Sequence, residues 1–323
     1  MKVSLPKNCP KVKEHGITKS LFLPSIELFC SMLKEGKYFK IMRFCHGWFD
    51  YIILQFSHAQ YHTFMKKKDY RGAAKHMYKS KGKGIWWNKW HGNVSLEILT
   101  TVTEAELKLQ CEYDNYDDVL IGATATQGVG RLKWKRGRRT HLLNHMMEFS
   151  SKPYLHGGLP KHWAVMDEFT LLFEQAAKCD IPIILIGPSY WEHCERLHEI
   201  KNCFFVPIRG TKAIKTIGKT IKQVKRKVNA LGKEPLILSG ASHLSALILL
   251  ELKKRANKDF FFMDVGKALD LRIHRAGYIG IPGRWLDANW VSRVEKARKG
   301  ADPIYQAKKR NNCPDFRSKG GWI

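Results

Sequence analysis

The sequence predicts an α/β fold: a Rossmann-like, mostly parallel sheet with helices on both faces, extended by basic insertions and a basic carboxyl-terminal tail. Two observations predict it. From about residue 182 onward, short apolar runs that end in small residues alternate with helical patterns, which is typical of parallel strands joined by crossover helices. The chain has 323 residues, 44% of them hydrophobic, so it can bury a sizeable core and is not a mostly disordered protein.

The strands and helices of the second half follow one another in a regular order. Short apolar runs predict buried strands at 183–186, 204–208, 236–238 and 260–265. Helical patterns between them predict helices at 190–200, 211–231 and 243–256. Gly232 follows the middle helix, as glycine commonly does at a helix end. Parallel strands in this order place a ligand crevice beyond their carboxyl ends.

The first half is less regular, and we expect it to contribute to the same sheet. Its patterns predict helices at 25–33 and 162–178 and strands at 38–44 and 119–121. The segment 66–93 is rich in Lys, Gly and Trp and has no sustained period, which predicts an insertion loop or a small subdomain. We therefore expect one domain over 17–284 and a basic extension over 285–323.

The charge of the chain indicates what it binds. Lysine and arginine number 56 and aspartate and glutamate 29, which gives a net charge of +27. This surplus is larger than solubility requires, so we expect a polyanionic partner. Nucleic acid is the first hypothesis, and an anionic membrane surface is the main rival.

Cysteine usage and apolar runs indicate the compartment. The 8 cysteines are dispersed and form no C-x-x-C pair, which favours reduced thiols over a disulfide framework. The first ten residues hold no apolar signal region, and no apolar run approaches the roughly 20 residues that a transmembrane helix needs. We expect a cytoplasmic protein without a transmembrane segment, and no pattern indicates its oligomeric state.

The strongest charge feature is the predicted helix 211–231. No acidic residue occurs between Arg209 and Lys227. At 3.6 residues per turn, one face of this helix is cationic and the opposite face is apolar. The cations of that face are Lys212, Lys215, Lys219, Lys222 and Arg226. A merely solvated helix face usually interleaves acids with its bases, so this pattern favours a surface that binds a polyanion.

Two further basic clusters contain tryptophans. One is Arg131, Lys133, Lys135, Arg136, Arg138 and Arg139, with Trp134 among them. The other, within 66–93, carries Trp86, Trp87 and Trp90 among lysines. Cations that bind phosphates, interleaved with rings that stack on bases, are typical of nucleic-acid binding. The alternative is that the tryptophans are core residues and the basic residues only flank them.

Strand-end loops carry the remaining functional signal, because the common nucleotide-binding, hydrolase, zinc-protease and kinase motifs are absent. The order of these loops resembles that of the GT-D type glycosyltransferases over roughly residues 20–270. The segment YFKIMRFCHGW at 38–48 keeps Arg43, Phe44 and Gly47 of an Arg-Phe-Gly-Asp-Gly-Glu type motif. The other matching segments are 151–154 (SKPY), 186–188 (IGP), 206–207 (VP), 238–242 (LSGAS) and 264–266 (DVG).

This resemblance implies a Rossmann-like enzyme that binds a nucleotide-sugar donor, with uridine diphosphate as the expected carrier. The residues it implies at the donor are Arg43, Phe44, His46, Lys152, Gly187, Ser189, Arg209, Gly240 and Ser242. Small residues at such turns let backbone amides approach a phosphate, although tight packing between helix and sheet selects small residues as well. Arg43, Lys152 and Arg209 are the expected cations for a leaving diphosphate.

One departure from the family pattern concerns the metal. The Asp-x-Glu that binds a divalent ion in the family falls on His46 and Trp48, and neither is a carboxylate. A metal-free site and a site in which Asp50 replaces the missing ligand are both compatible with the sequence. For the general base that an acceptor hydroxyl needs, Asp264 is the first candidate, Asp50 the second and Asp270 the third. Asp264 has a second interpretation, as a capping or packing carboxylate.

Fold and charge together lead to one function. A transferase needs no charge of +27 to bind a single donor, so the surplus points to the acceptor. We expect a glycosyltransferase that modifies hydroxymethylated bases in double-stranded DNA, of the kind used by viruses of bacteria. One alternative keeps the transferase with a surface-glycan or lipid-linked acceptor at an anionic membrane. Another is a non-catalytic nucleic-acid-binding protein with the same fold.

Overall fold

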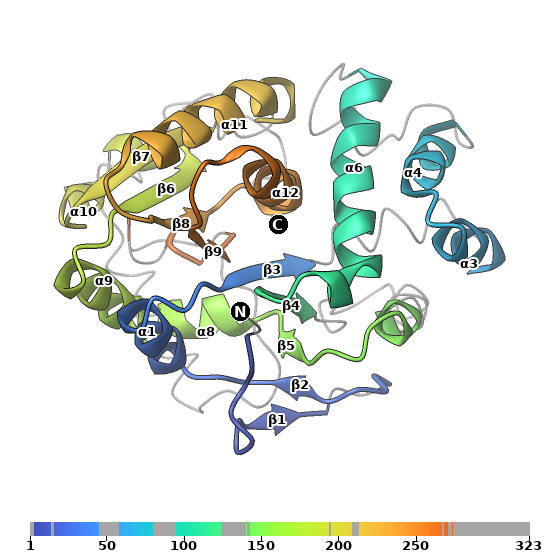
Figure 1. Cartoon of the computed structure of the whole chain (residues 1–323), viewed down its shortest axis with the longest axis horizontal. Helices are drawn as coiled ribbons and strands as arrows, with labels where there is room; N and C mark the ends of the chain where they lie inside the picture. Colours follow the sequence, from blue (N-terminus) through green and yellow to red (C-terminus); the bar gives the residue numbers. More distant parts are fainter. Residues whose placement is uncertain are drawn as a thin grey trace, which may run out of the picture.

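A computed structural model describes residues 3–13, 16–44, 58–79, 95–123, 140, 143–193, 195–208, 213–266, 268–270 and 273. In this part of the chain, nine strands form one sheet in the order β1-β2-β5-β4-β3-β9-β8-β6-β7 (Figure 1). Their bounds are Lys11–Val12, Leu21–Phe22, Lys40–Phe44, Val119–Ala123, Tyr154–His156, Ile183–Pro188, Cys203–Ile208, Leu236–Ser239 and Phe261–Asp264, numbered in chain order. All neighbours pair in parallel except β1 with β2.

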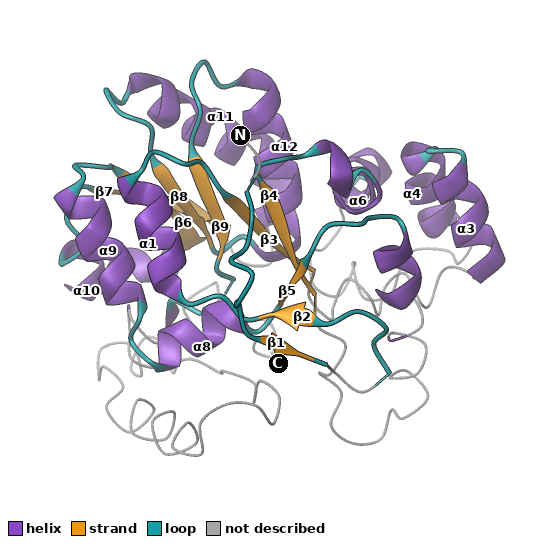
Figure 2. Cartoon of the chain, turned by 60° about the horizontal axis from the view of Figure 1, so that its bottom comes forward, coloured by secondary structure: helices purple, strands orange, loops and turns teal. Residues whose placement is uncertain are grey.

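Helices cover both faces of the sheet, and Figure 2 shows the strands between them. One face carries α6 (Leu96–Cys111), α11 (Ala213–Ala230) and α12 (Ser245–Arg255), with α3 (His58–Lys66) and α4 (Tyr70–Lys79) beside α6. The other face carries α1 (Ile26–Lys34), α8 (Leu159–Val165), α9 (Phe169–Lys178) and α10 (Glu195–His198). Short 3₁₀ helices are η1 (Tyr113–Asn115), η2 (Ser189–His193) and η4 (Ser242–Leu244). The α/β fold with a mostly parallel sheet is therefore confirmed.

Burial explains why the strands of the second half are recognisable in the sequence. Every residue of β6, β8 and β9 is buried, because helices cover both faces of these strands. The helix α11 follows the predicted pattern, with an apolar face that packs on the sheet. The buried apolar residues of that face include Ile214, Ile217, Ile221, Val224 and Val228.

Three predicted elements differ from the structure. The predicted helix 162–178 is two helices, α8 and α9, because residues 166–168 form a turn in which Asp167 has φ +57°. The predicted helix 190–200 is η2 followed by the short α10. The segment 66–93, predicted as an insertion loop or a small subdomain, contains the last residue of α3 and the whole of α4, and its residues 80–93 lie outside the described part.

The segment 70–79 is helical because Asp69 caps it and α6 covers it. The Asp69 side chain accepts a hydrogen bond from the backbone amide of Gly72 at 2.8 Å. Ala73 and Ala74 are fully buried, and Arg71 pairs with Glu97 and Glu104 of α6. The loop alternative is thus wrong for 70–79, and the small-subdomain alternative stays a prediction.

Residues 274–323 lie outside the described part, and with them the whole predicted basic extension 285–323. Among the described residues, no helix is both long enough and apolar enough to cross a membrane.

Candidate active site at the carboxyl edge of the sheet

The chain leaves the neighbouring strands β3 and β9 toward opposite faces of the sheet. After β9, Val265, Ala268 and Leu269 pack into the core that contains α1 and α9. After β3, the next described helices α3, α4 and α6 pack into the core on the other face. Two parallel neighbours whose connections diverge form a topological switch point, where open α/β sheets bind their ligands.

Arg43 and Asp264 meet at this switch point. Arg43 is the penultimate residue of β3. Its Nε donates a hydrogen bond to the backbone oxygen of Asp264 at 2.8 Å. Its Nη2 lies 3.6 Å from Oδ1 of Asp264, and its Nη1 donates to the backbone oxygen of Gly157 at 3.4 Å. The side chains are only 10% and 2% exposed, respectively. Arg43 therefore joins the carboxyl ends of β9 and β5 from its place on β3.

Gly266 makes room for this arrangement. Its φ is +52°, and a Cβ at this position would overlap the Nη2 atom of Arg43. Its backbone amide donates to Oδ1 of Asp264 at 3.0 Å. On the other side of Arg43, a Cβ on Gly122 of β4 would lie 3.4 Å from the Cγ of Arg43. The positive φ and the overlap together favour glycine at position 266, where the guanidinium passes, whereas at Gly122 the contact with Arg43 would be an ordinary one.

The environment of Asp264 suits a proton acceptor. Burial raises the pKa of Asp264, and the charge of Arg43 with the hydrogen bonds from Gly266 and Arg43 offsets this only in part, so the pKa stays above its usual range. Among the described residues, none donates a hydrogen bond to the second carboxylate oxygen, Oδ2. One oxygen is thus held by the backbone amide of Gly266, and the other accepts no hydrogen bond from a described residue.

The helix α6 adds a second carboxyl, which the sequence analysis did not identify. Glu106 is 3% exposed, and its pKa is raised well above the usual range by burial and by the charge of Asp264. The sequence contains a signal for it: Thr100, Thr103, Glu106 and Gln110 follow one another at three- and four-residue spacing, so they lie toward one side of the helix. Another residue missed in the sequence is His156, which is buried at the carboxyl end of β5.

The predicted donor residues Gly187 and Gly240 have a packing role. Trp191 of η2 is fully buried, and a Cβ on Gly187 would overlap its ring. A Cβ on Gly240 would lie 3.1 Å from the same ring and 3.1 Å from the backbone oxygens of Ile186 and Gly266. Their small size accommodates Trp191, as the tight-packing alternative expects, and their place at the donor stays a prediction.

The third catalytic candidate, Asp270, has a structural partner. Its Oδ1 accepts a hydrogen bond from Nε1 of Trp191 at 2.7 Å, and its side chain is buried. A buried indole N–H needs such an acceptor. Asp270 therefore holds Trp191 in its position, and its assignment as the third candidate base stays a prediction.

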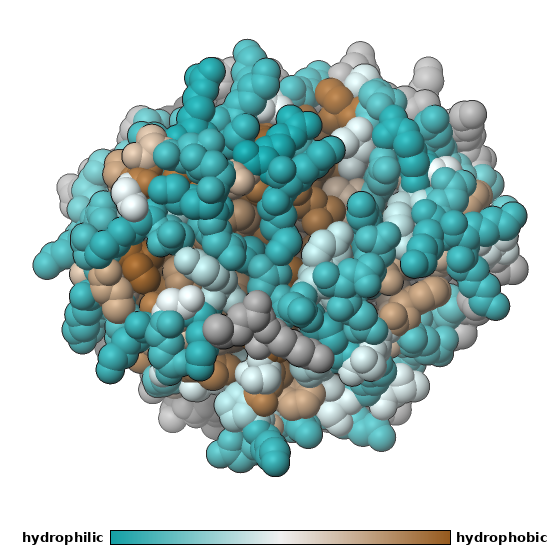
Figure 3. Space-filling model, in the orientation of Figure 1, coloured by the Kyte–Doolittle hydropathy of each residue, from teal (hydrophilic) through white to brown (hydrophobic). Residues whose placement is uncertain are grey.

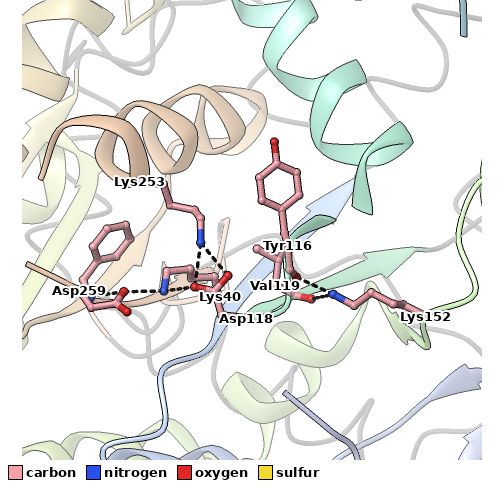
Figure 4. Close-up of polar contacts among 8 residues, drawn as sticks. Lys40, Tyr116, Asp118, Val119, Lys152, Lys253 and Asp259 are labelled. Atoms are coloured by element: carbon pink, nitrogen blue, oxygen red, sulfur yellow. Dashed lines mark hydrogen bonds and ion pairs between the residues drawn. The ribbon is translucent and has the colours of Figure 1, made fainter. Parts of the chain in front are cut away.

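Lys152 lies at the opposite edge of the sheet from Arg43. Its Nζ donates to the backbone oxygens of Tyr116 at 2.6 Å and Val119 at 2.8 Å (Figure 4). Val119 is the first residue of β4, so this is the amino edge of the sheet, and Lys152 is only 6% exposed. The prediction that Lys152 lies beside the donor is therefore corrected: its ammonium donates hydrogen bonds to main-chain carbonyls at the amino edge of the sheet, whereas the donor is expected at the carboxyl edge.

The other predicted residues divide into two groups. Phe44 is buried in the core, Ser189 begins η2 and is half-buried, and Ser242 begins η4. The following lie outside the described residues: His46, Asp50, Trp86, Trp87, Trp90, Arg131, Lys133, Lys135, Arg136, Arg138, Arg139, Arg209 and Lys212.

No group of three potential metal ligands occurs among the described side chains. His46 and Trp48 lack the oxygen ligands that a divalent ion bridging a diphosphate needs, so no step is assigned to a metal.

The helix α11 presents its cations to solvent, as its pattern predicts. Lys215, Lys219, Lys222 and Arg226 are all exposed, and none pairs with a carboxylate in the described part of the chain. Figure 3 shows hydrophilic side chains over most of this face of the molecule. Because α11 follows the carboxyl end of β7, its first turn lies at the same edge of the sheet as Arg43.

Comparisons with known proteins add no relative. A scan against protein-family models, a search of curated proteins and a search of solved structures each found no match to this chain.

Proposed function

We propose that the protein is a glycosyltransferase that moves a sugar from a nucleotide-sugar donor to a hydroxyl on a hydroxymethylated base in double-stranded DNA, in the cytoplasm. Two features of the fold support it. Arg43 and Asp264 form a buried ion pair at the topological switch point. A cationic helix face starts at the same edge of the sheet. The second feature carries the choice of acceptor.

In this proposal Asp264 is the general base. Its Oδ2 takes the proton of the acceptor hydroxyl while the hydroxyl oxygen bonds to the anomeric carbon, and the nucleoside diphosphate leaves with the electron pair of the broken C–O bond. The raised pKa of Asp264 favours this proton transfer. Arg43 holds Oδ1 and adds a positive charge beside the position of the leaving diphosphate.

The acceptor duplex lies along α11. The exposed cations from Lys215 to Arg226 span about 16 Å of helix at about 1.5 Å per residue. This is the length of about five base pairs at about 3.4 Å per nucleotide, so four cations face several consecutive phosphates. A base flipped out of this stretch approaches the carboxyl edge of the sheet, where Asp264 lies.

A salt titration of duplex binding tests the choice of acceptor. Four phosphate contacts predict a slope of about −3.6 for log K against log salt concentration. A slope this steep, with tight binding at physiological salt, supports duplex DNA as the acceptor. Weak duplex binding, with binding to vesicles of anionic lipid instead, overturns it and favours the membrane-bound acceptor.

A further inference from the structure

A cavity of about 430 Å³ lies at the outer edge of the sheet, where β7 begins. β7 is the last strand in the order of the sheet, with α11 along one side and the short α10 before it (Figure 1). The half-buried rings of Phe204 and Phe205 line the cavity, together with the buried Leu197 and Ile200. This volume lies within the range of small-ligand sites, roughly 300–1,000 Å³. The cavity is at the amino edge of the sheet and is therefore separate from the site at Asp264.

The charged groups at this cavity are cationic. Lys201 and His198 line it and are exposed, and none of its lining residues is acidic. A further cation comes from α11, where the ammonium of Lys227 lies 4.9 Å from the centre of the Phe204 ring. Within the described residues, neither lysine pairs with a carboxylate. Burial raises the pKa of the Cys203 thiol to about 12, so this lining group stays uncharged at neutral pH. Cations beside aromatic rings suit a ligand that combines a flat ring with negative charge.

The main chain of β7 adds hydrogen-bonding groups at the same edge. The amide of Ile183 donates to the backbone oxygen of Asn202 at 2.9 Å, so Asn202 faces the neighbouring strand β6. Because the direction of the main-chain groups alternates along a strand, Cys203 and Phe205 turn their N–H and C=O groups away from β6. No described residue forms a hydrogen bond with these outward groups. They are therefore donors and acceptors that a ligand in the cavity can use.

This edge suits a single base better than an added strand. Pro207 is the next outward position after Phe205 and has no N–H, so a ladder along β7 lacks that donor. An unpaired nucleobase needs fewer groups, because its edge carries donors and acceptors side by side and its ring stacks on aromatic side chains. The phosphate that accompanies the base meets the cations beside the rings.

We propose that this cavity binds an unpaired nucleobase of a DNA strand that follows the cationic face of α11. This inference rests on the nucleic-acid partner of the proposed function and does not require sugar transfer. The base stacks on Phe204, its edge bonds to the outward main-chain groups of β7, and Lys201 and Lys227 contact its phosphates. The exposed cations of α11 lead toward the cavity, because α11 runs from the carboxyl edge to the amino edge and packs on β7. The protein should therefore prefer a duplex with an unpaired end to a blunt one.

The first test compares the binding of two duplexes of equal paired length, one blunt and one with a short single-stranded adenine tail. We expect the wild type to bind the tailed duplex about tenfold more tightly, the gain from one stacked base. Phe204→Leu should bind both duplexes alike, with the affinity of the wild type for the blunt one. The matched control is Phe22→Leu on β2, another half-buried ring with a lysine ammonium, that of Lys11, 4.7 Å from its centre. This control should keep the preference.

Two results of this comparison overturn the proposal. One is equal affinity of the wild type for the blunt and the tailed duplex. The other is an undiminished preference for the tailed duplex in a folded Phe204→Leu variant.

The second test uses an exposed side chain, so the variant keeps its packing. The salt slope of wild-type binding should be steeper for the tailed duplex than for the blunt one by about 0.7 for each phosphate contact of the tail. Lys201→Gln should lower this excess by about 0.7, and the control Lys34→Gln, exposed on α1, should leave it unchanged. An undiminished excess in Lys201→Gln overturns the placement of the base in this cavity.

A single-stranded adenine oligonucleotide separates this inference from the proposed function. Weak binding of the blunt duplex, with tight binding of the single strand that Phe204→Leu loses, overturns the duplex acceptor and supports the cavity. Tight binding of the blunt duplex without a preference for the tailed one overturns the cavity alone. Weak binding of both the duplexes and the single strand overturns both proposals.

Discussion

Arg43 and Asp264 are 221 residues apart in the sequence and are joined by a hydrogen bond of 2.8 Å from Nε of the arginine to the backbone oxygen of the aspartate. The pair links β3 to β9 at the point where the chain leaves these strands toward opposite faces. At this point a guanidinium that is 10% exposed lies beside a carboxylate that is 2% exposed. The first prediction follows from this pair.

Replacing Arg43 by Gln removes the counter-ion of Asp264. A buried charge left without its partner costs about 3–5 kcal/mol of unfolding free energy. The pKa of Asp264 then rises further, because the arginine charge lowers it in the wild type. We expect the low-pH limb of the pH–rate profile to move to higher pH in Arg43→Gln. An unchanged limb, in a variant that still folds, contradicts the role of Asp264 as the titrating base.

Gly266→Ala tests the space around the guanidinium. Gly266 has φ +52°, and a methyl group there overlaps Nη2 of Arg43. The matched control is Gly36→Ala, since Gly36 has φ +64° and no atom within 4 Å of the new methyl group. We expect Gly36→Ala to cost about 1 kcal/mol from backbone strain alone and Gly266→Ala to cost more and to lower activity. Equal unfolding free energies of the two variants, by urea titration, contradict the close packing around Arg43.

The amino edge of the sheet has its own buried ion pairs, shown in Figure 4. Lys40 is fully buried, with its Nζ 2.5 Å from Asp118 and 2.9 Å from Asp259. We expect Asp118→Asn to cost about 3–5 kcal/mol, since it removes the better buried of the two carboxylates that pair with Lys40 and leaves only the half-exposed Asp259. Asp259→Asn costs less, because Asp259 is 47% exposed. Equal costs for both variants in urea titrations contradict this ranking.

The ion pairs of Asp118 also predict a dependence of the unfolding free energy on pH. Burial opposes ionisation of Asp118, but Lys40 and Lys253 together outweigh it and lower the pKa. The stabilisation is therefore present above the unfolded pKa of about 3.9 and is lost as pH falls through the folded pKa. Between about pH 6 and about pH 2, the wild type should lose more unfolding free energy than Asp118→Asn. Equal losses of unfolding free energy in the wild type and in Asp118→Asn contradict this explanation.

Neutralising three lysines of α11 tests the duplex surface. The variant Lys215→Gln/Lys219→Gln/Lys222→Gln removes three exposed cations and should make the salt slope of duplex binding shallower by about 2.7. Donor binding should stay unchanged, because the site at Asp264 is not altered. The control is Lys13→Gln/Lys34→Gln/Lys178→Gln, which removes three exposed cations from other elements. If the salt slope of duplex binding changes equally in both triple variants, binding responds only to net charge, and the assignment of the duplex surface to α11 is contradicted.

The fold is largely predictable from the sequence, for physical reasons that differ between elements. The strand β6 is recognisable because both of its faces are buried, so its apolar run is continuous. The helix α11 is recognisable because its apolar face packs and its other face carries no acid. The strand β5 has only three residues, too few for a periodic pattern. The break near Asp167 depends on a residue with positive φ, which sequence periodicity does not reveal.

The site is less predictable, because one residue type serves several purposes. Gly187 and Gly240 match a phosphate-binding turn in sequence, yet they accommodate the buried ring of Trp191. Lys152 matches a donor-binding position, yet its ammonium binds two carbonyls at the amino edge. Glu106 is far from every matching segment, and only the three-dimensional packing of α6 brings it near Asp264.

Sugar transfer is the measurement that tests the central claim most directly. Duplex DNA with hydroxymethylated bases is incubated with uridine diphosphate sugars and either the wild type or Asp264→Asn. The DNA is then digested to nucleosides, and their masses are measured by mass spectrometry. We predict a sugar adduct with the wild type and a rate at least about 10²-fold lower with folded Asp264→Asn. An equal rate for Asp264→Asn contradicts its role as the base. Tight duplex binding by a wild type that forms no adduct contradicts the transferase and favours a non-catalytic nucleic-acid-binding protein.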